Sequence, residues 1–162
     1  MEEGVGEGLN SGGRAGYPIV DLRVRLLRGE HHSVDSSEFA FRVAAGKALS
    51  AAFVNSHPIV LEPIMKVEIV TPNEYMGSVV GEINARRGTV TQITARAGQQ
   101  VVLAEAPLAT LFGIATDLRS SSQGRATCSL QFSHYGNLPA SLADQIVTQG
   151  TNQENCHGQG KV

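Results

Sequence analysis

Hydrophobic and polar positions between residues 61 and 135 repeat one small design twice. Each copy is a strand, a helix that begins with Pro and carries one apolar stripe, and a second strand. The copies cover 63–70, 72–87 and 90–95, and then 100–105, 107–119 and 125–133. Strand–helix–strand twice is the order of a βαββαβ split-βαβ sandwich. We therefore predict an α+β module with one open sheet face, which favours binding over catalysis.

The apolar stripes define the expected core of this module. Thr71 is the predicted N-cap of the first helix, because Glu74 follows it at capping-box spacing and Pro72 suits the first helical position. The second helix begins near Pro107. The residues expected to face inward are Met76, Val79, Val80, Ile83, Leu108, Leu111, Phe112, Ala115, Leu118, Ala126, Cys128, Leu130 and Phe132.

A shorter unit precedes the module. Over residues 18–27, Val20, Leu22, Val24 and Leu26 alternate with charged residues, which predicts a half-buried strand. A helix is expected from Ser36 to about Val54, with Asp35 as its N-cap and the apolar face Phe41, Ala44, Ala45, Ala48 and Ala52. One strand and one helix cannot bury each other, so this unit is interpreted as part of a larger domain.

The amino-acid composition predicts a flexible segment at each end of the chain. Residues 1–16 are rich in glycine and predict a loose N-terminal segment, followed by the partial unit at 17–60 and the module at 61–136. Residues 137–162 form a C-terminal segment, and its polar tail is expected to be disordered.

The whole-chain composition is that of a globular protein. The 162 residues are 41% hydrophobic and 17% charged, with a net charge of −2, so nucleic-acid binding would depend on local basic patches. Cys128 and Cys156 lie in unrelated settings, which favours a reducing compartment over a disulfide framework. We expect a soluble intracellular protein without a leader, because no apolar run approaches the roughly 18 residues of a membrane span.

The sequence predicts no nucleotide site, hence no cofactor. Its one Gly-Lys pair is Gly46-Lys47, but Arg42 stands where a phosphate loop would begin. Ala48 replaces the Ser or Thr that such a loop needs after its Lys.

Metal binding and nucleophilic catalysis have equally little support. The pairs His31-His32 and Cys156-His157 lack second pairs at zinc-site spacing. Ser133, His134 and Asp144 are of the right types for nucleophilic catalysis, but no motif places them together. We therefore predict that the chain is not an enzyme.

Basic residues gather at two corners of the module, one after each helix. The candidate RNA contacts are Arg86, Arg87, Arg119, Ser120, Gln123 and Arg125. Cations at helix C-termini also complement the helix dipole, which contributes about 0.3–1 kcal/mol each. The arginines at these corners can therefore be interpreted either as partners of the helix dipoles or as contacts to RNA phosphates, and both interpretations stay open.

Blocks of consecutive residues resemble the C-terminal domain of translation elongation factor G, of the bacterial and organellar type. They are Leu61–Glu68, Thr71–Gly77, Asn84–Gly88, Ala106–Ala109, Phe112–Gly113, Ala115–Ser120 and Gln123–Arg125. Upstream, Glu2–Val5, Ala15–Asp21 and Val34–Glu38 resemble the end of that factor's domain IV. The resemblance runs from about Glu2 to Ile146.

The resemblance implies a ferredoxin-like domain V, preceded by a partial α/β remnant of a domain with a ribosomal-protein-S5-like fold. It implies a ribosome-binding part of a translational GTPase, acting in translocation or recycling. The candidate arginines would contact large-subunit rRNA near the sarcin–ricin loop and the stalk base. Expected compartments are the bacterial cytoplasm, the mitochondrion or the plastid, and the missing domains are a further expected partner, in trans.

The chain departs from the family in two respects. The GTPase domain, which binds GTP in the full-length family, has no counterpart in this sequence. Gly6, Gly8 and Gly12-Gly13 fall where the family has a helix of better helix formers, and each interior Gly costs roughly 0.5–1 kcal/mol. An alternative to the ribosomal role is a protein–protein interaction module derived from the same family.

Overall fold

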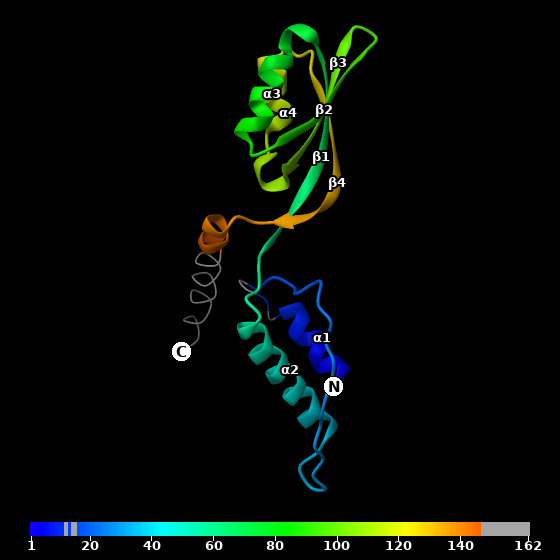
Figure 1. The fold of residues 1–162 in the computed structure, drawn as a ribbon, viewed down its shortest axis with the longest axis vertical. Coiled ribbons are helices and arrows are strands. Elements are labelled where there is room, and N and C mark those ends of the chain that lie inside the picture. The colour runs from blue at the N-terminus through cyan, green and yellow to red at the C-terminus, as the bar shows by residue number, and fades with distance from the viewer. Residues whose placement is uncertain (12, 14–15, 147–162) are drawn as a thin grey trace, which may run out of the picture. The chain divides into compact units, whose positions relative to one another are not determined.

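The computed structural model describes residues 1–11, 13 and 16–146, and the chain divides into two compact units (Figure 1). Unit 2 is Leu61–Leu138, and unit 1 contains Met1–Val60 together with the chain from Pro139 onward. Residues 140–146 are helical. The predicted disordered tail lies outside the described residues.

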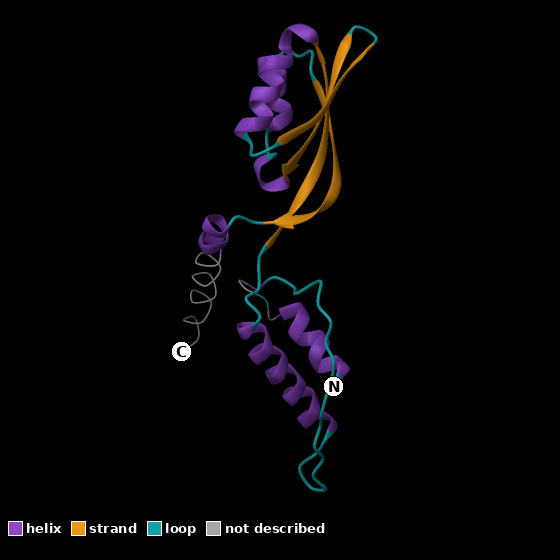
Figure 2. Cartoon of the chain, viewed as in Figure 1, coloured by secondary structure: helices purple, strands orange, loops and turns teal. Residues whose placement is uncertain are grey.

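Unit 2 is a four-stranded antiparallel sheet with the strand order β2-β3-β1-β4. Figure 2 shows its two α-helices on the same side of the sheet. In chain order the elements are β1 (Leu61–Pro72), a 3₁₀ turn (Asn73–Tyr75), α3 (Met76–Ala85), β2 (Thr89–Arg96), β3 (Gln99–Pro107), a 3₁₀ turn (Leu108–Thr110), α4 (Ile114–Ser121) and β4 (Thr127–Asn137). The predicted α+β class and βαββαβ order are confirmed.

The core of unit 2 lies between the sheet and the two helices. On β1 the alternating residues Val67 and Ile69 are fully buried, and they pair with Ala104 and Val102 of β3. Small side chains on β3 leave room for the helices, whose buried residues complete the cluster. Its members are Val67, Ile69, Val79, Ile83, Val102, Ala104, Ala106, Leu111, Ile114, Leu118 and Ala126. Burying each Val, Ile or Leu contributes about 1.5–3 kcal/mol.

Both helices of unit 2 begin later than predicted. Thr71 is not an N-cap, because β1 continues to Pro72 and Thr71, paired with Gln100, follows the inward alternation of the strand. Similarly, Pro107 ends β3, and α4 begins only after Gly113, whose φ is +80°. Each proline therefore marks the exit from a strand, not the first helical turn.

The later start of α4 corrects part of the predicted apolar stripe. Phe112 lies in the turn before α4 and is 75% exposed, whereas Ile114, which the stripe omitted, is buried. Leu111 and Leu118 are buried as predicted.

The inward pattern predicted for β4 holds only at its beginning. Ala126 is buried and Cys128 packs against the core. Leu130 and Phe132, paired with Val67 and Met65, are exposed. They belong to β4, an edge strand of the sheet, where only one side of the strand has a neighbour in the sheet.

Unit 1 contains two packed helices, α1 (Glu2–Ser11) and α2 (Glu38–Asn55). The N-cap of α2 is Ser37 and not the predicted Asp35: the Ser37 hydroxyl oxygen accepts the N–H of Ala40 at 3.1 Å. Asp35 lies in the preceding turn, 3.5 Å from a ring nitrogen of His32.

The strand predicted over residues 18–27 is wrong, because the segment pairs with no strand in the described part of the chain. The alternation exists in the sequence, but a ladder needs a second strand to receive its hydrogen bonds. The apolar residues of the segment are therefore exposed.

The loose segment predicted for residues 1–16 is corrected by α1. A Cβ on Gly4 would lie 2.2 Å from the carbonyl oxygen of Arg42, and one on Gly8 would lie 2.8 Å from a methyl of Leu49. The glycines that weaken an isolated helix thus let α1 approach α2 closely.

Charge adds to the contact between α1 and α2. The Arg42 guanidinium donates to both carboxylate oxygens of Glu7, at 3.1 and 2.6 Å, and lies 3.6 Å from Glu3. The hydrogen bond and charge of Glu7 raise the pKa of Arg42 above its usual range.

Gly4→Ala should release α1 from α2 even though Ala favours a helix by about 0.5–1 kcal/mol. The added methyl would collide with the backbone of Arg42, which cannot give way as a side chain can. We expect faster hydrogen exchange of the α1 amides.

Gly6→Ala is the matched control, because a Cβ at Gly6 meets no atom within 4 Å among the described residues. It should slow exchange in α1. Slower exchange in Gly4→Ala as well would contradict the close packing at Gly4.

Candidate nucleic-acid interface

Both helices of unit 2 end in a left-handed residue followed by a glycine whose N–H closes a 6→1 hydrogen bond, and α3 also has the second bond of a Schellman motif, from Arg87 N–H to the Asn84 carbonyl. In each, the N–H of a glycine reaches back to the last turn: Gly88 to the carbonyl of Ile83 at 2.9 Å, and Gly124 to that of Arg119 at 2.8 Å. The residue before each glycine, Arg87 or Gln123, is left-handed, with φ of +60° and +53°. The two corners predicted from the repeat therefore occupy equivalent places in its two copies.

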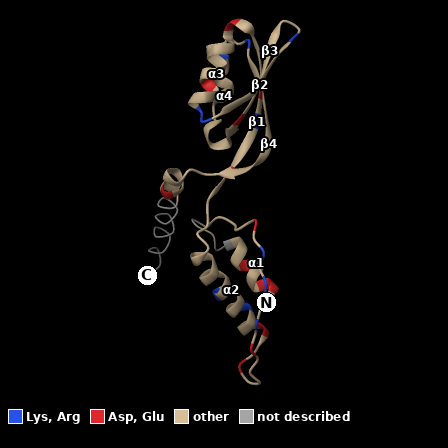
Figure 3. Ribbon diagram, viewed as in Figure 1, with Lys and Arg blue, Asp and Glu red and all other residues tan. Residues whose placement is uncertain are grey.

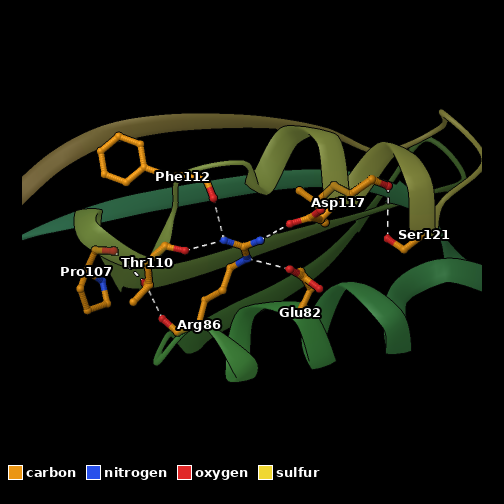
Figure 4. Close-up of polar contacts among 8 residues, drawn as sticks. Glu82, Arg86, Pro107, Thr110, Phe112, Asp117 and Ser121 are labelled. Carbon is orange, nitrogen blue, oxygen red and sulfur yellow. Dashed lines mark hydrogen bonds and ion pairs between the residues drawn. The ribbon is translucent and has the colours of Figure 1, made fainter.

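The first corner is dominated by Arg86, whose guanidinium joins three parts of the unit (Figure 4). Nε donates to Glu82 of α3 at 2.6 Å, and Nη1 donates to the carbonyl of Phe112 at 3.1 Å and to that of Thr110. Nη2 pairs with Asp117 of α4. The Arg86 side chain is only 15% exposed, so its donors are engaged inside the protein.

The Arg86 backbone is held as well. The Thr110 hydroxyl donates to the Arg86 carbonyl at 2.6 Å, while the Arg86 side chain binds the turn that contains Thr110. We call Arg86, Glu82, Asp117 and Thr110 the Arg86 clamp. It fixes α3 against α4.

Arg87 is also bound internally. It pairs with Glu62 at the start of β1, whose side chain is 9% exposed. A carboxylate this buried needs a cation beside it, because an unpaired buried charge is strongly unfavourable. The two arginines of the first corner are therefore engaged in structural contacts.

The second corner is open. Arg119, Ser120 and Gln123 are exposed, and within the described residues the Arg119 side chain makes no hydrogen bond or ion pair. Arg125 pairs with Glu74 at 2.8 Å, with both side chains more than half exposed. We call Arg119, Ser120, Gln123 and Arg125 the α4 corner.

The backbone of the α4 corner is well fixed. The buried Ser122 hydroxyl donates to the carbonyl of Leu118 at 2.5 Å and accepts the N–H of Ala126 at 2.8 Å. It thereby joins the end of α4 to the approach to β4. The exposed side chains of the corner project from a rigid support.

Helical spacing separates the α4 corner from the Arg86 clamp. Arg119 is two residues from Asp117, and positions two apart do not face each other on a helix. Asp117 faces α3 through Arg86, so Arg119 projects away from the clamp. It also lies in the last turn of α4, where a cation complements the dipole.

The sequence identified the arginines but not their partners. Glu82 and Arg86 are four residues apart on one helix, a spacing that signals an ion pair. Glu62 and Asp117 are distant along the chain from their arginines, so only the fold brings them together.

The arrangement suits weak anion binding and not acid–base chemistry. Arg119, Ser120 and Gln123 offer donors to phosphate oxygens. In Figure 3 the Lys and Arg positions of unit 2 are interspersed with Asp and Glu along the ribbon. Any phosphate contact would therefore be local.

Ser133 and His134 lie in contact, at 3.0 Å, but are not arranged for nucleophilic catalysis. The Ser133 hydroxyl donates to Glu105 at 3.1 Å, whereas an activated nucleophile gives its proton to a His that a carboxylate orients.

The described part of the chain holds no cluster of metal ligands and no helix that could span a membrane. No three His, Cys, Asp or Glu side chains gather there as metal ligands would. The helices found there are too short or too polar to span a membrane.

Arg86→Met should destabilise unit 2 by about 2–3 kcal/mol, because Glu82 and Asp117 lose their partner and two carbonyls lose a donor. The measurement is the free energy of unfolding from hydrogen exchange of the β1 amides. Arg119→Met is the matched control and should change that free energy by less than about 0.5 kcal/mol. Equal effects would show that the Arg86 clamp contributes little.

Two family models match successive parts of the chain. The elongation factor G domain IV model matches residues 1–57, and the elongation factor G C-terminus model matches residues 59–146. Both are non-catalytic domains of that translation factor. Together they span both units of the described fold.

A solved structure is similar over most of the chain. It is the crystal structure of ttk003000868 from Thermus thermophilus, with 34% identity and a TM-score of 0.85. The match covers 93% of this chain but 23% of that one. The family and structural matches agree: the chain belongs to the elongation factor G family, and it carries sequence of domain IV followed by the C-terminal domain.

Proposed function

We propose that this chain is a ribosome-binding portion of an elongation factor G-like translation protein. The α4 corner is the contact surface, and its ligand is the phosphate backbone of large-subunit rRNA near the sarcin–ricin loop and the stalk base. The observation that carries this assignment is the exposed Arg119 side chain, which has no partner among the described residues and extends from a rigid helix end.

The remaining family roles are part of the same proposal. The chain acts in translocation or ribosome recycling, in the bacterial cytoplasm, the mitochondrion or the plastid. Hydrolysis of GTP belongs to a different domain of the full-length family, so domains in trans are its second partner. The two non-catalytic domains matched here support a binding role and not a chemical one.

A second candidate function is a protein–protein interaction module without a ribosomal role. The exposed apolar segment at residues 20–26 of unit 1 favours it, because such a segment can pair with another chain. The two candidates use different units, so variants of unit 2 distinguish them.

Cosedimentation with purified bacterial ribosomes tests the α4 corner. The chain should sediment with ribosomes at low salt and be released as salt rises, because phosphate contacts displace counterions. Arg119→Glu should weaken sedimentation and reduce the log–log salt slope by about 1.

Arg96→Glu is the matched control, since it makes the same charge change at an exposed position near the hairpin between β2 and β3. It should sediment as the unsubstituted chain does. Equal losses in both variants would remove the α4 corner as the contact, and absence of sedimentation at low salt would remove the ribosomal role.

The purified chain should release no phosphate from GTP, because Arg42 and Ala48 stand where a phosphate loop needs other residues. The assay is phosphate release across size-exclusion fractions. Activity that coelutes with the chain at constant specific activity would contradict this expectation.

A further inference from the structure

Arg125 is held more weakly than the other ion-paired arginines of unit 2. In the described structure its side chain makes one contact, from Nη1 to a carboxylate oxygen of Glu74 at 2.8 Å, and both side chains are more than half exposed. Arg86, by contrast, makes four hydrogen bonds, and Arg87 pairs with a buried carboxylate. Ion pairs between exposed side chains contribute little to stability. The Arg125–Glu74 pair is therefore the one that a competing anion would break most easily.

The backbone on both sides of this pair does not depend on it. Glu74 lies in the 3₁₀ turn Asn73–Tyr75, which is closed by a hydrogen bond from the N–H of Met76 to the carbonyl of Asn73. On the other side, the N–H of Arg125 donates to the carbonyl of Ser122 at 3.0 Å. The two side chains can therefore separate without a change of fold.

Arg119 and Arg125 extend from the two ends of one closed turn. The N–H of Gly124, the residue before Arg125, donates to the carbonyl of Arg119 at 2.8 Å and holds the ends together. Two cations on one turn repel each other unless an anion lies beside them. Glu74 is the anion beside Arg125, whereas the Arg119 side chain has no partner among the described residues.

We propose that Glu74 holds Arg125 in the unbound chain in place of an RNA phosphate, and that a phosphate displaces Glu74 when the chain binds the ribosome. This inference rests on the function proposed for the α4 corner and adds an autoinhibitory contact to it. Arg119 is open to RNA from the start, and Arg125 is a second contact that forms by exchange of one anion for another.

The exchange favours phosphate for two reasons. A guanidinium makes bidentate, charge-assisted hydrogen bonds to phosphate oxygens, whereas Arg125 makes a single one to Glu74. Contact with RNA also releases counterions, a gain that an internal carboxylate does not supply. Until it is displaced, the Glu74 carboxylate repels phosphates near the corner. Glu74 should therefore lower the affinity of the α4 corner for RNA.

Glu74→Gln tests the exchange, because the amide keeps the shape of the side chain and removes its charge. The dissociation constant for purified bacterial ribosomes, measured by cosedimentation at low salt, should fall about three- to fivefold. Glu68→Gln is the matched control, since Glu68 is exposed on β1 between buried Val67 and Ile69 and so projects from the face of the sheet opposite the helices. It should change the dissociation constant less than about twofold.

A double-mutant cycle separates the exchange from a general effect of charge. Arg125→Gln alone should weaken sedimentation and reduce the log–log salt slope by about 1, because one phosphate contact is lost. Adding Glu74→Gln to Arg125→Gln should have no effect beyond that of Glu68→Gln, since no guanidinium remains to be released. Hydrogen exchange of the β4 amides should be unchanged in Glu74→Gln, which excludes an effect through folding.

Binding of polyuridylic acid, followed by fluorescence anisotropy at low salt, repeats the cycle without the ribosome. Glu74→Gln should strengthen this binding, and the gain should disappear in Arg125→Gln. That result would support the exchange even if the chain does not sediment with ribosomes, the outcome that removes the proposed function.

Three results would overturn the exchange. If Glu74→Gln strengthens ribosome binding no more than Glu68→Gln does, the ribosomal role stands but Glu74 does not restrain Arg125. A gain that persists in Arg125→Gln would come from general repulsion of RNA. Absence of binding to both ribosomes and polyuridylic acid would remove this inference together with the proposed function.

Discussion

The arrangement of unit 2 depends on one guanidinium. Arg86 joins α3, α4 and the turn before α4 through carboxylates and carbonyls, so both helices are fixed over one face of the sheet. That constraint sets the direction of α4 and therefore of Arg119, which lies on another side of the helix. The surface proposed for RNA is thus positioned by an arginine that cannot itself reach RNA. Loss of the charge of Arg86 should therefore lower the stability of unit 2, whereas loss of the charge of Arg119 should weaken only contact with RNA.

The two units differ in how much of their apolar surface they bury. Unit 2 closes its own core, with Val67, Ile69 and Val102 fully buried beneath its helices. Unit 1 joins two helices through glycine contacts but leaves an alternating segment and most of α2 exposed. Unit 1 contains the residues that match the domain IV family, and its described helices α1 and α2 pack on each other without a sheet.

The sequence predicted the order of unit 2, because period-2 and helical patterns report which face of each element is apolar. It could not predict contacts that depend on the assembled fold. Leu130 and Phe132 fit the inward pattern but are exposed, because they lie on the edge strand β4. The alternation at residues 20–26 predicted a strand, yet strand formation depends on a partner. Of the six candidate residues that the sequence named, Arg86 and Arg87 are engaged inside the fold by Asp117 and Glu62, two partners that sequence spacing could not reveal.

Arg87 and Gln123, the left-handed residues that follow α3 and α4, differ in whether their side chains have a partner inside the fold. A non-glycine residue in this conformation costs roughly 1 kcal/mol or more. At Arg87 the ion pair with buried Glu62 offsets the strain. At Gln123 the side chain faces solvent, and the described structure offers no such compensation. Glycine there would relax the backbone at no loss of internal contact. The strained Gln123 side chain thus makes no internal contact that the structure describes, and its amide is one of the donors that the α4 corner presents to solvent.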